Sequence, residues 1–420
     1  MIVVGGGIAG LVAARELAIG GMRVTVLEAS DRLGGKVARH WVAGIELDAG
    51  AESFATRRDT VASLARSLGL EASVVRPNSA GAWLFATDGT AFPLPKTGLL
   101  GIPGIPLAAD VIGIIGFWAA LRAQLDELMP GPVASKEQNF GRLVRRRMGR
   151  AVLERLVAPV TLGIHSRHPN DLDVDVVAPG LRAAMLSTGS LAHGVLKLRD
   201  AAPAGSAVSG IVGGMFELIE ALGRDLEKRG VLVRTSARVT SADANGVTLS
   251  GGERLDADRV VLATPLAPPV ETPIVLATLV VEAPQLDASP RGTGLLIAPG
   301  GTGIRAKALT HATAKWAWLA ETVVEHSGEH RHVLRLSYDR VPLEQLQERA
   351  RQDAERLLGV TLTPSSVVGF AHVEWSLPAS KPEPIDGVTV VGESVAGIGI
   401  AAVIAHANRE AERLLQEVEA

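Results

Sequence analysis

The first ten residues contain the motif that most constrains this chain. A short apolar run, Ile2 to Val4, leads directly into Gly5-x-Gly7-x-x-Gly10, and a helical pattern follows from Leu11 to Ile19. In a dinucleotide-binding turn the first glycine allows a tight bend, the second lets the backbone approach a pyrophosphate, and the third lets the helix pack close to the strand. Free N–H groups at the helix start favour anionic phosphates. The sequence therefore predicts a βαβ unit that binds a dinucleotide.

The residues after the first helix make this prediction more specific. A second apolar run, Met22 to Leu27, ends at Glu28, where a carboxylate can accept hydrogen bonds from a ribose. A strand, a glycine turn, a helix, a second strand and an acid in register form a much stronger signal than three glycines alone.

A second glycine pair follows in Glu28-Ala29-Ser-Asp-Arg32-Leu-Gly34-Gly35-Lys36. With this segment the chain resembles the FAD-containing amine oxidase and protoporphyrinogen oxidase superfamily, whose members carry an acid, a basic residue and then Gly-Gly-Arg or Gly-Gly-Lys. The resemblance implies that the segment wraps the adenosine and pyrophosphate of a non-covalently bound FAD. An NAD dehydrogenase would not need it.

Composition limits the remaining classes. The chain has 420 residues, 47% of them hydrophobic, and a mean hydropathy of +0.24, so we expect a large core and two or three structural regions. The net charge of −3 argues against binding nucleic acid. The absence of cysteine excludes disulfides, thiolate metal sites and flavin attachment through sulfur, and it fits a reducing cytoplasm. Because the first strand starts at residue 2, we expect no signal or transit peptide.

We expect an α/β fold. It comprises a Rossmann-like FAD-binding domain of the glutathione-reductase or amine-oxidase type, a mixed-sheet substrate domain and an inserted helical region. The discontinuous FAD-binding domain takes residues 1–76, 205–268 and 375–420. Residues 77–106 and 269–374 form the substrate domain, and 107–204 the helical region. Locally, the pattern predicts a hairpin at 83–95 and helices at 60–68, 215–229 and 343–358.

The most apolar window, Gly98 to Ala120, could suggest a membrane-spanning helix. Its uninterrupted part, Val111 to Leu121, is half the length of about twenty residues that a spanning helix needs. We expect a helix buried against the substrate pocket, with a peripheral contact at a membrane surface as the alternative. The basic segment that follows is interpreted as a solvated helix face, or else as a contact for anionic substrate groups or lipid phosphates; its arginines are Arg142, Arg145, Arg146, Arg147, Arg150 and Arg155.

Several later segments narrow the resemblance. They include Asp48-Ala-Gly50-Ala-Glu52-Ser53-Phe54, Leu156-Val-Ala-Pro159 with the residues after it, and the tail from Gly392 to Ala401. These are similar to the bacterial protoporphyrinogen and coproporphyrinogen oxidases, in order along essentially the whole chain. The resemblance implies oxidation of coproporphyrinogen III to coproporphyrin III in haem biosynthesis. Hydride would pass to the flavin, and dioxygen would reoxidise it with release of hydrogen peroxide.

The same resemblance assigns the residues around FAD. Gly213, Gly214 and Met215 approach the flavin, Val239 meets the adenine, and Glu393 holds the ribityl chain. The full set of cofactor-binding candidates is Gly5, Gly7, Ile8, Ala9, Gly10, Glu28, Ala29, Arg32, Gly34, Gly35, Lys36, Gly50, Ala51, Glu52, Ser53, Val239, Ala263, Thr264, Pro265, Trp316, Trp375, Gly392, Glu393, Gly397, Ile398, Gly399 and Ile400.

No pair of acid–base residues is identified as catalytic. The flavin itself carries the reaction, and the protein candidates beside it are Lys307, Lys315 and Trp316. Where mitochondrial relatives carry a substrate-binding arginine this chain has Ala82, and its segment 378–386 is shorter than in relatives. Charge-assisted bonds are the natural way to orient the substrate carboxylates. The candidates for these bonds are Arg57, Arg58, Lys96, Arg182 and Lys307. The expected partners are the porphyrinogen, dioxygen and a downstream enzyme of haem synthesis.

Other functions stay open at this point. The substrate could be protoporphyrinogen IX, and the chain could instead be an amine oxidase, a carotenoid desaturase or a catalytically silent FAD-binding interaction protein. An aromatic cage for an amine is hard to build with one tyrosine, Tyr338. His326, His330 and His332 suggest a metal site, but their surroundings favour a polar loop between strands, so we predict no metal.

Overall fold

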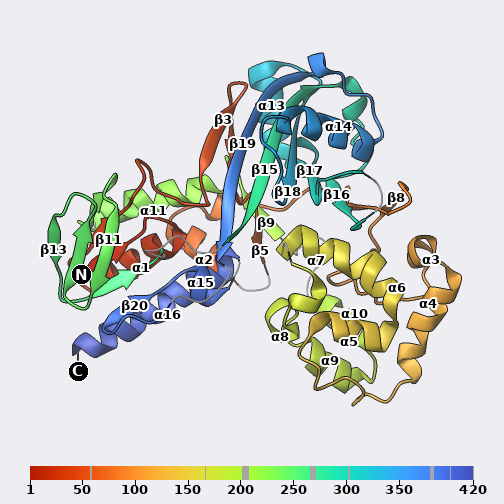
Figure 1. Cartoon of the computed structure of the whole chain (residues 1–420), viewed down its shortest axis with the longest axis horizontal. Helices are drawn as coiled ribbons and strands as arrows, with labels where there is room; N and C mark the ends of the chain where they lie inside the picture. Colours follow the sequence, from red (N-terminus) through yellow and green to blue (C-terminus); the bar gives the residue numbers. More distant parts are fainter. Residues whose placement is uncertain are drawn as a thin grey trace. The chain divides into compact units, whose positions relative to one another are not determined.

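The computed structural model describes residues 1–56, 59–165, 167–200, 208–264, 271–300, 303–378, 383–397 and 399–419. The chain divides into two compact units (Figure 1). Unit 1 comprises Met1–Pro77, Ala207–Ile274 and Val373–Ala420, and unit 2 comprises Asn78–Ser206 and Val275–His372.

A five-stranded parallel sheet forms the centre of unit 1. Its strand order is β10-β2-β1-β14-β20, so three distant parts of the chain supply neighbouring strands. The carboxyl ends of parallel strands share one edge of a sheet, and ligands of open α/β sheets bind at that edge. The strands are β1 (Ile2–Val4), β2 (Thr25–Leu27), β10 (Leu232–Arg234), β14 (Val260–Leu262) and β20 (Val388–Val390).

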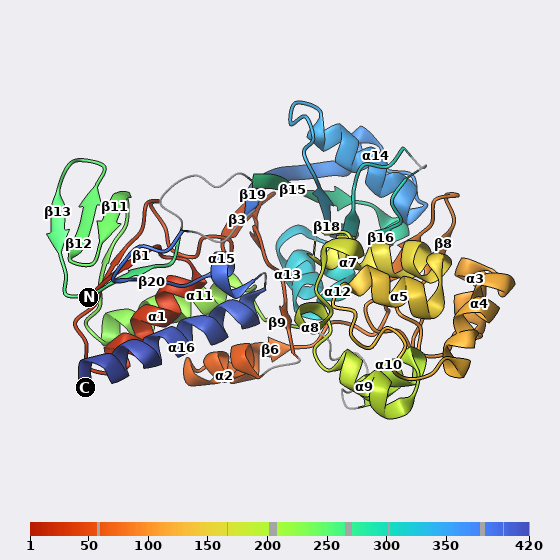
Figure 2. The same cartoon turned by 60° about the horizontal axis from the view of Figure 1, so that its bottom comes forward.

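The side chains of these strands point alternately to the two faces of the sheet, and both faces are buried. Val3, Val26 and Val261 point to one face and pack with α1 (Ile8–Ile19), α11 (Phe216–Lys228) and α16 (Ile400–Glu419). Val4 and Leu262 point to the other face, which a three-stranded antiparallel sheet covers (Figure 2). That sheet consists of β11 (Val239–Asp243), β12 (Gly246–Leu249) and β13 (Arg254–Asp256). Burial of both faces explains why β1 and β14 are apolar throughout.

Smaller elements complete unit 1. β3 and β4 form a hairpin, β9 pairs with both β5 and β6, and α2 and α16 are in contact. The bounds are β3 (Arg39–Val42), β4 (Ile45–Asp48), β5 (Phe54–Ala55), α2 (Thr60–Ser67), η1 (Glu71–Ser73), β6 (Val74–Val75), β9 (Val208–Ile211) and α15 (Glu393–Ala396).

Unit 2 contains a mixed seven-stranded sheet with the order β19-β15-β18-β17-β16-β7-β8. β16 and β7 pair in parallel, whereas β17 pairs antiparallel with both β16 and β18. The predicted hairpin at 83–95 is confirmed as β7 and β8. The strands are β7 (Trp83–Phe85), β8 (Ala91–Pro93), β15 (Glu271–Glu282), β16 (Gly294–Ile297), β17 (Ala308–His311), β18 (Arg331–Tyr338) and β19 (Val367–Pro378); the helical elements are η5 (Pro284–Leu286), α12 (Ala312–Lys315), α13 (Ala317–Ser327), α14 (Leu346–Leu358) and η6 (Pro364–Ser366).

The helical region of unit 2 is built around its own apolar core. A π-helical turn lies just before Pro159, which has no N–H to donate to the carbonyl of Arg155 in an α-helical register. The elements are α3 (Ala109–Ile115), α4 (Phe117–Gln124), η2 (Leu125–Leu128), α5 (Phe140–Met148), α6 (Arg150–Val152), η3 (Leu153–Val157), α7 (Ala158–His165), η4 (Pro169–Asp171), α8 (Val174–Val177), α9 (Leu181–Thr188) and α10 (Leu191–Asp200).

The apolar run from 111 to 121 is not one helix. Gly116, at φ +84°, ends α3 and starts α4. Val111, Ile114 and Ile115 are buried as expected, but Phe117 and Trp118 are exposed, so the expectation of a buried helix is wrong at these two residues. Among the described residues, no helix is both long enough and apolar enough to cross a bilayer.

Arg147 is a second correction, because it lies on the buried side of α5 and not on a solvated face. It shares the i, i+3, i+4, i+7 stripe with Phe140, Leu143 and Val144. Its guanidinium forms an ion pair with the fully buried Asp126 and donates to the carbonyl of Gly189 at 3.1 Å. The second carboxylate oxygen of Asp126 accepts the N–H of Ala192 at 2.9 Å. The pair therefore ties α5 to η2 and to the turn between α9 and α10.

We predict that Arg147→Met lowers the free energy of unfolding of unit 2 by about 3–5 kcal/mol, because it leaves the Asp126 carboxylate buried without its cation. Urea denaturation followed by far-UV circular dichroism measures this loss. Arg145→Met, an exposed position on the same helix, is the matched control and should change stability by less than about 0.5 kcal/mol. Equal effects of the two substitutions would contradict the buried role of Arg147.

Candidate functional site

The predicted phosphate-binding turn is formed at the carboxyl end of β1. Gly5 has φ +108° and donates its N–H to the Leu27 carbonyl at 2.8 Å. A Cβ on Gly10 would lie 1.9 Å from the Gly5 carbonyl oxygen, whereas a Cβ on Gly7 would meet nothing within 4 Å. Gly10 therefore permits close packing, and the backbone at Gly7 faces open space. Among the residues that the structure describes, no side chain caps the start of α1, so its first N–H groups remain available to an anion.

Glu28 is held by the turn itself. One carboxylate oxygen accepts the N–H of Gly6 at 2.6 Å, and the other accepts the N–H and the hydroxyl of Ser30 at 2.8 and 2.7 Å. A carboxylate offers about four acceptor positions, so these three bonds leave room for about one more. Glu28 thus both fixes the turn and keeps one acceptor position for a ribose hydroxyl.

The second glycine pair lies directly beside the first motif. Gly34 donates its N–H to the Gly6 carbonyl at 2.8 Å and forms a bridge with Gly7. A Cβ on Gly50 would lie 1.9 Å from the Lys36 carbonyl oxygen, which requires glycine there. Backbone contacts therefore bring the segments around residues 6, 35 and 50 together.

Asp48 links the third motif to the middle segment of the chain. Its carboxylate oxygens accept the N–H groups of Met215 and Phe216 at 3.0 and 3.2 Å, at the start of α11. Gly213 and Gly214 both have positive φ, so the chain can turn sharply before this helix. The sequence showed Asp48 only as part of a family segment, because nothing local indicates which distant helix an acid will cap.

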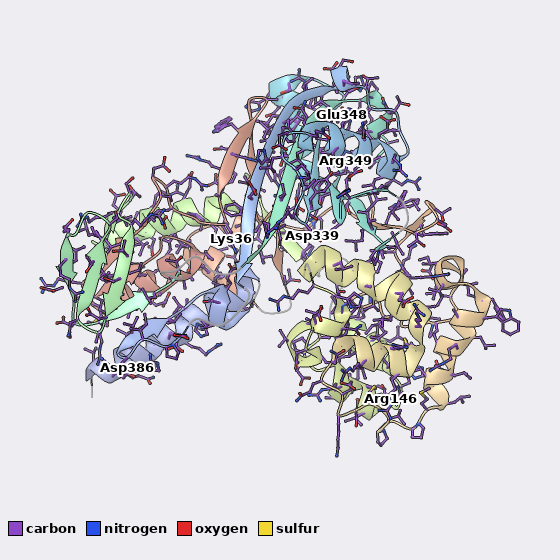
Figure 3. The ribbon with its side chains drawn as sticks, in the orientation of Figure 1. Lys36, Arg146, Asp339, Glu348, Arg349 and Asp386 are labelled. Atoms are coloured by element: carbon purple, nitrogen blue, oxygen red, sulfur yellow. The ribbon has the colours of Figure 1, made fainter. Side chains whose placement is uncertain are left out.

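Lys36 connects this assembly to the last part of the chain. Its ammonium forms an ion pair with the Glu393 carboxylate and donates to the Ser376 carbonyl. Figure 3 shows Lys36 at the end of β19 that contains Ser376. The adjacent Trp375 has a buried indole N–H with no hydrogen-bond partner among the described residues, and this nitrogen would lie 3.4 Å from a Cβ on Gly50. A buried donor beside a glycine-lined backbone fits a polar, planar cofactor.

The remaining candidates of unit 1 fall into two groups. Ala263 donates its N–H to the Val4 carbonyl at 2.8 Å, and Thr264 lies against Gly5, so both are at the turn. Gly392 and Gly397 flank α15, and Gly399 precedes α16, all at positive φ. The other described candidates of unit 1 lie in the same segments, at the start of α1, beside the second glycine pair, before β5 and at the starts of β11 and α16: Ile8, Ala9, Ala29, Arg32, Ala51, Glu52, Ser53, Val239 and Ile400. Pro265, Ile398, Arg57 and Arg58 lie outside the described residues.

The other candidates belong to unit 2. Trp316 is buried after α12, and the Lys315 ammonium lies 5.1 Å from the centre of its ring. Lys307 forms an ion pair with Asp339 at 2.6 Å, and Arg182 bonds Asp175 at 3.0 Å, so both cations already have carboxylate partners. Lys96 is exposed.

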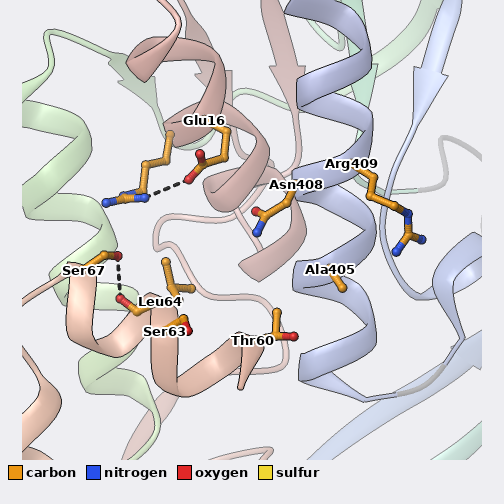
Figure 4. Close-up of a pocket in the computed structure, with 9 residues that line it drawn as sticks. Glu16, Thr60, Ser63, Leu64, Ser67, Ala405, Asn408 and Arg409 are labelled. Atoms are coloured by element: carbon orange, nitrogen blue, oxygen red, sulfur yellow. Dashed lines mark hydrogen bonds and ion pairs between the residues drawn. The ribbon is translucent and has the colours of Figure 1, made fainter. Parts of the chain in front are cut away.

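Two hollows of unit 1 lie at different places relative to the dinucleotide motif. A groove of about 450 Å³ lies between α1, α2 and α16 and includes Glu16, Ser63 and Asn408 (Figure 4). It is remote from the turn, because Glu16 sits in the second half of α1. A hollow of about 380 Å³ is lined by Ser236 and Ala237, which donate N–H groups to the carbonyls of Ser30 and Glu28 at 2.7 and 2.8 Å. The smaller hollow is the one that adjoins the dinucleotide motif.

The histidine cluster is not a loop between strands, so that interpretation is wrong. His326 is in α13 and His332 is in β18. Asp287 accepts hydrogen bonds from His330 at 2.7 Å and from His332 at 3.0 Å. Within the described ranges, no group of three or more His, Cys, Asp or Glu side chains is arranged to hold a metal ion.

A buried chain of imidazoles continues from this cluster. Nδ1 of His332 lies 3.1 Å from Nε2 of His311, which is fully buried. Because Asp287 accepts from His332 Nε2, we assign the proton between the rings to His311 Nε2. His311 Nδ1 is then a bare acceptor, and it has no hydrogen-bond partner among the described residues.

This chain is similar to known proteins both in sequence and in fold. A family model described as flavin containing amine oxidoreductase matches residues 8–270. The coproporphyrinogen III oxidase of Propionibacterium freudenreichii is 29% identical over 63% of this chain, and the match spans 56% of that relative's length. The coproporphyrinogen III oxidase of Mycobacterium leprae is 28% identical over 99% of this chain and 98% of its own. A structure from Exiguobacterium sp. 255-15, provisionally named protoporphyrinogen oxidase, has a TM-score of 0.81 and 24% identity, covering 99% of this chain and 98% of its own. This likeness confirms the predicted fold class.

We predict that acid destabilises unit 2 through His311. Burial, and then the nearby His332, lower the pKa of His311 to about 3, whereas the unfolded value is about 6.5. The unfolded chain therefore binds this proton first, and the stabilisation present above pH 6.5 is lost as the pH falls towards 3. Between pH 7 and pH 5 the loss should be about 2 kcal/mol. Denaturant titrations of wild type and His311→Gln at both pH values measure it, and an equal pH dependence of the two proteins would contradict the assignment.

Proposed function

This chain belongs to the flavin containing amine oxidoreductase family, and we propose that it oxidises coproporphyrinogen III to coproporphyrin III with FAD as its cofactor. The observation that carries this proposal is the similarity to the Mycobacterium leprae coproporphyrinogen III oxidase, which extends through nearly the whole of both chains. Dioxygen as the electron acceptor, hydrogen peroxide as a product and a downstream enzyme of haem synthesis as a partner belong to the same proposal.

We assign the binding of FAD to unit 1. The free N–H groups of α1 and the open backbone at Gly7 suit the pyrophosphate, and the acceptor position left on Glu28 suits a ribose hydroxyl. In the proposed site the flavin ring would meet the glycine-rich start of α16, whose backbone N–H groups and positive helix end would stabilise the negative charge gained on reduction. Bound there, FAD supplies the capacity to accept a hydride from the substrate.

The substrate carboxylates require cations, and the described candidates differ in whether they already have carboxylate partners. Lys96 is exposed, while Lys307 and Arg182 would have to exchange Asp339 and Asp175 for a substrate carboxylate. The side chains of Asp339 and Asp175 are 62% and 51% exposed, so water can solvate either carboxylate after such an exchange, and its cost is small. We therefore keep Arg57, Arg58, Lys96, Arg182 and Lys307 as the proposed partners. The proposed catalytic neighbours of the flavin are Lys307, Lys315 and Trp316.

A rival function as an amine oxidase is disfavoured by Tyr338. The chain's one tyrosine is buried in the core beneath α14, where its hydroxyl donates to Asp353 at 3.2 Å. It cannot contribute to an aromatic cage around an amine. Protoporphyrinogen IX is the second candidate substrate, supported by the provisional name of the Exiguobacterium protein.

We predict that the FAD-loaded protein converts coproporphyrinogen III to a fluorescent porphyrin with release of hydrogen peroxide, and that its kcat/KM for protoporphyrinogen IX is lower. The reason is that the four carboxylates of the first substrate offer more charge-assisted contacts than two. Porphyrin fluorescence and a peroxide assay measure both reactions, with benzylamine and putrescine as control substrates. A higher kcat/KM for protoporphyrinogen IX would reverse the substrate assignment. FAD binding without turnover of any substrate would favour a silent interaction protein.

We also infer a peripheral contact between the helical region and an anionic membrane surface. Exposed apolar side chains gather on and around α4, including Trp118 at 78% and Leu128 at 80% exposure; the others are Ile105, Leu107, Phe117 and Leu125. Arg122 donates to the Arg146 carbonyl at 3.2 Å, so the basic α5 lies beside this surface; Figure 3 labels Arg146 there. An apolar surface with aromatic residues and adjacent arginines is complementary to anionic lipid.

We predict that the protein sediments with vesicles of phosphatidylglycerol and phosphatidylcholine and much less with phosphatidylcholine alone. Trp118→Ser should weaken the binding about tenfold, because the indole no longer enters the interface. Trp41→Ser, which removes a tryptophan of 64% exposure from β3, is the control and should leave binding unchanged. No sedimentation, or a Trp118-dependent self-association without lipid, would contradict the membrane contact.

A further inference from the structure

Lys36 contacts two segments that lie far from it in the sequence. Its ammonium forms an ion pair with Glu393, the first residue of α15, and donates to the carbonyl of Ser376 near the end of β19. These partners are 357 and 340 residues away. The Lys36 carbonyl meanwhile accepts the N–H of Ala51 at 3.3 Å. One residue thus joins the segment of the second glycine pair to the segments that carry Trp375 and Glu393.

This ion pair should be stronger than a fully exposed pair, because both of its side chains are partly buried. The side chains of Lys36 and Glu393 are 36% and 29% exposed, so each has lost much of its hydration. Gly392, at φ +110°, places Glu393 directly after a sharp bend, and a Cβ on Gly392 would approach the Ala263 carbonyl at 3.3 Å. The backbone at Glu393 is therefore packed against the end of β14, while Lys36 fixes the carboxylate.

The sequence resemblance implies that Lys36 contacts FAD directly. The structure favours a different role, because the ammonium already has a carboxylate and a carbonyl as acceptors. A pyrophosphate that displaced Glu393 from the ammonium would leave a half-buried carboxylate unpaired, which is unfavourable. A pyrophosphate that did not displace it could receive only the third N–H of the ammonium.

We propose that Lys36 is a positioning residue that acts on FAD through Glu393. Its ammonium holds the Glu393 carboxylate and the Trp375 segment in place, and it neutralises a carboxylate that would otherwise add negative charge beside the flavin. This inference rests on the proposed FAD site in unit 1. Lys36 would then support the residues that touch the cofactor without touching the cofactor itself.

The affinity for FAD tests the proposal. The apoprotein is titrated with FAD, and the quenching of flavin fluorescence gives Kd for wild type and four variants: Lys36→Met, Lys36→Arg, Glu393→Gln and the double variant Lys36→Met with Glu393→Gln. We expect Lys36→Met to raise Kd about tenfold and Lys36→Arg to restore it to within about threefold of wild type. Because Lys36 acts through Glu393, the double variant should be no weaker than the weaker single variant. Lys228→Met, an exposed lysine at the end of α11, is the matched control and should leave Kd unchanged.

The reduction potential of the bound flavin is the second measurement, because a purely structural role would leave it unchanged. With Lys36→Met the unpaired Glu393 carboxylate should make the potential more negative, since reduction adds negative charge to the flavin. The double variant should return it to the wild-type value. Circular dichroism confirms that each variant is folded.

The outcomes separate this inference from the cofactor assignment. Additive losses of affinity in the double variant would show that Lys36 contacts FAD independently of Glu393, and an unchanged potential with Lys36→Met would show a purely structural role. Either result would make the proposal wrong. A wild-type apoprotein that binds no FAD would instead overturn the FAD site itself.

Discussion

The parallel hydrogen-bond ladder around β1 is the interaction on which unit 1 depends. Val4 is paired with Leu27 on one side and with Leu262 on the other, and Leu262 is paired with Val390. The ladder continues one step beyond the strands, because Gly5 donates to Leu27 and Ala263 donates to Val4, each at 2.8 Å. The turn, the end of β14 and the tail therefore reach the same edge of the sheet, although they lie hundreds of residues apart.

Close backbone approach is the second constraint, and it explains where glycine is required. At Gly10 and Gly50 a Cβ would come within 1.9 Å of a carbonyl oxygen, so no side chain is tolerated there. Gly7 is different, because a Cβ would meet nothing within 4 Å. Packing among the described residues therefore does not require glycine at this position, whereas the proposed approach of FAD to the backbone would. The two kinds of glycine look alike in the sequence and differ only in the structure.

The sequence predicted features that depend on local pattern and missed those that depend on distant partners. The turn, the hairpin at 83–95 and the fold class follow from glycine spacing, strand alternation and the resemblance, and they are confirmed. Arg147 looked like its exposed neighbours, because its partner Asp126 lies on another element. His332 looked like part of a polar loop, but it lies in β18. The pairing of β18 with β15 joins residues far apart in the sequence, so local pattern did not reveal it. The assignments of individual cofactor and substrate residues remain predictions.

The distribution of charge in unit 1 also follows from its packing. The protein engages three of the carboxylates in the proposed cofactor segments: Glu28 accepts from Gly6 and Ser30, Asp48 accepts from the start of α11, and Glu393 is paired with Lys36. The Lys36 ammonium balances the charge of Glu393, while backbone N–H groups stabilise the charges of Glu28 and Asp48 without removing them. The start of α1 is different, since no side chain in the described part of the chain caps it. A region whose acids are satisfied and whose free backbone donors lie at a helix N-terminus is electrostatically suited to an anionic dinucleotide, even though the whole chain carries a net charge of −3.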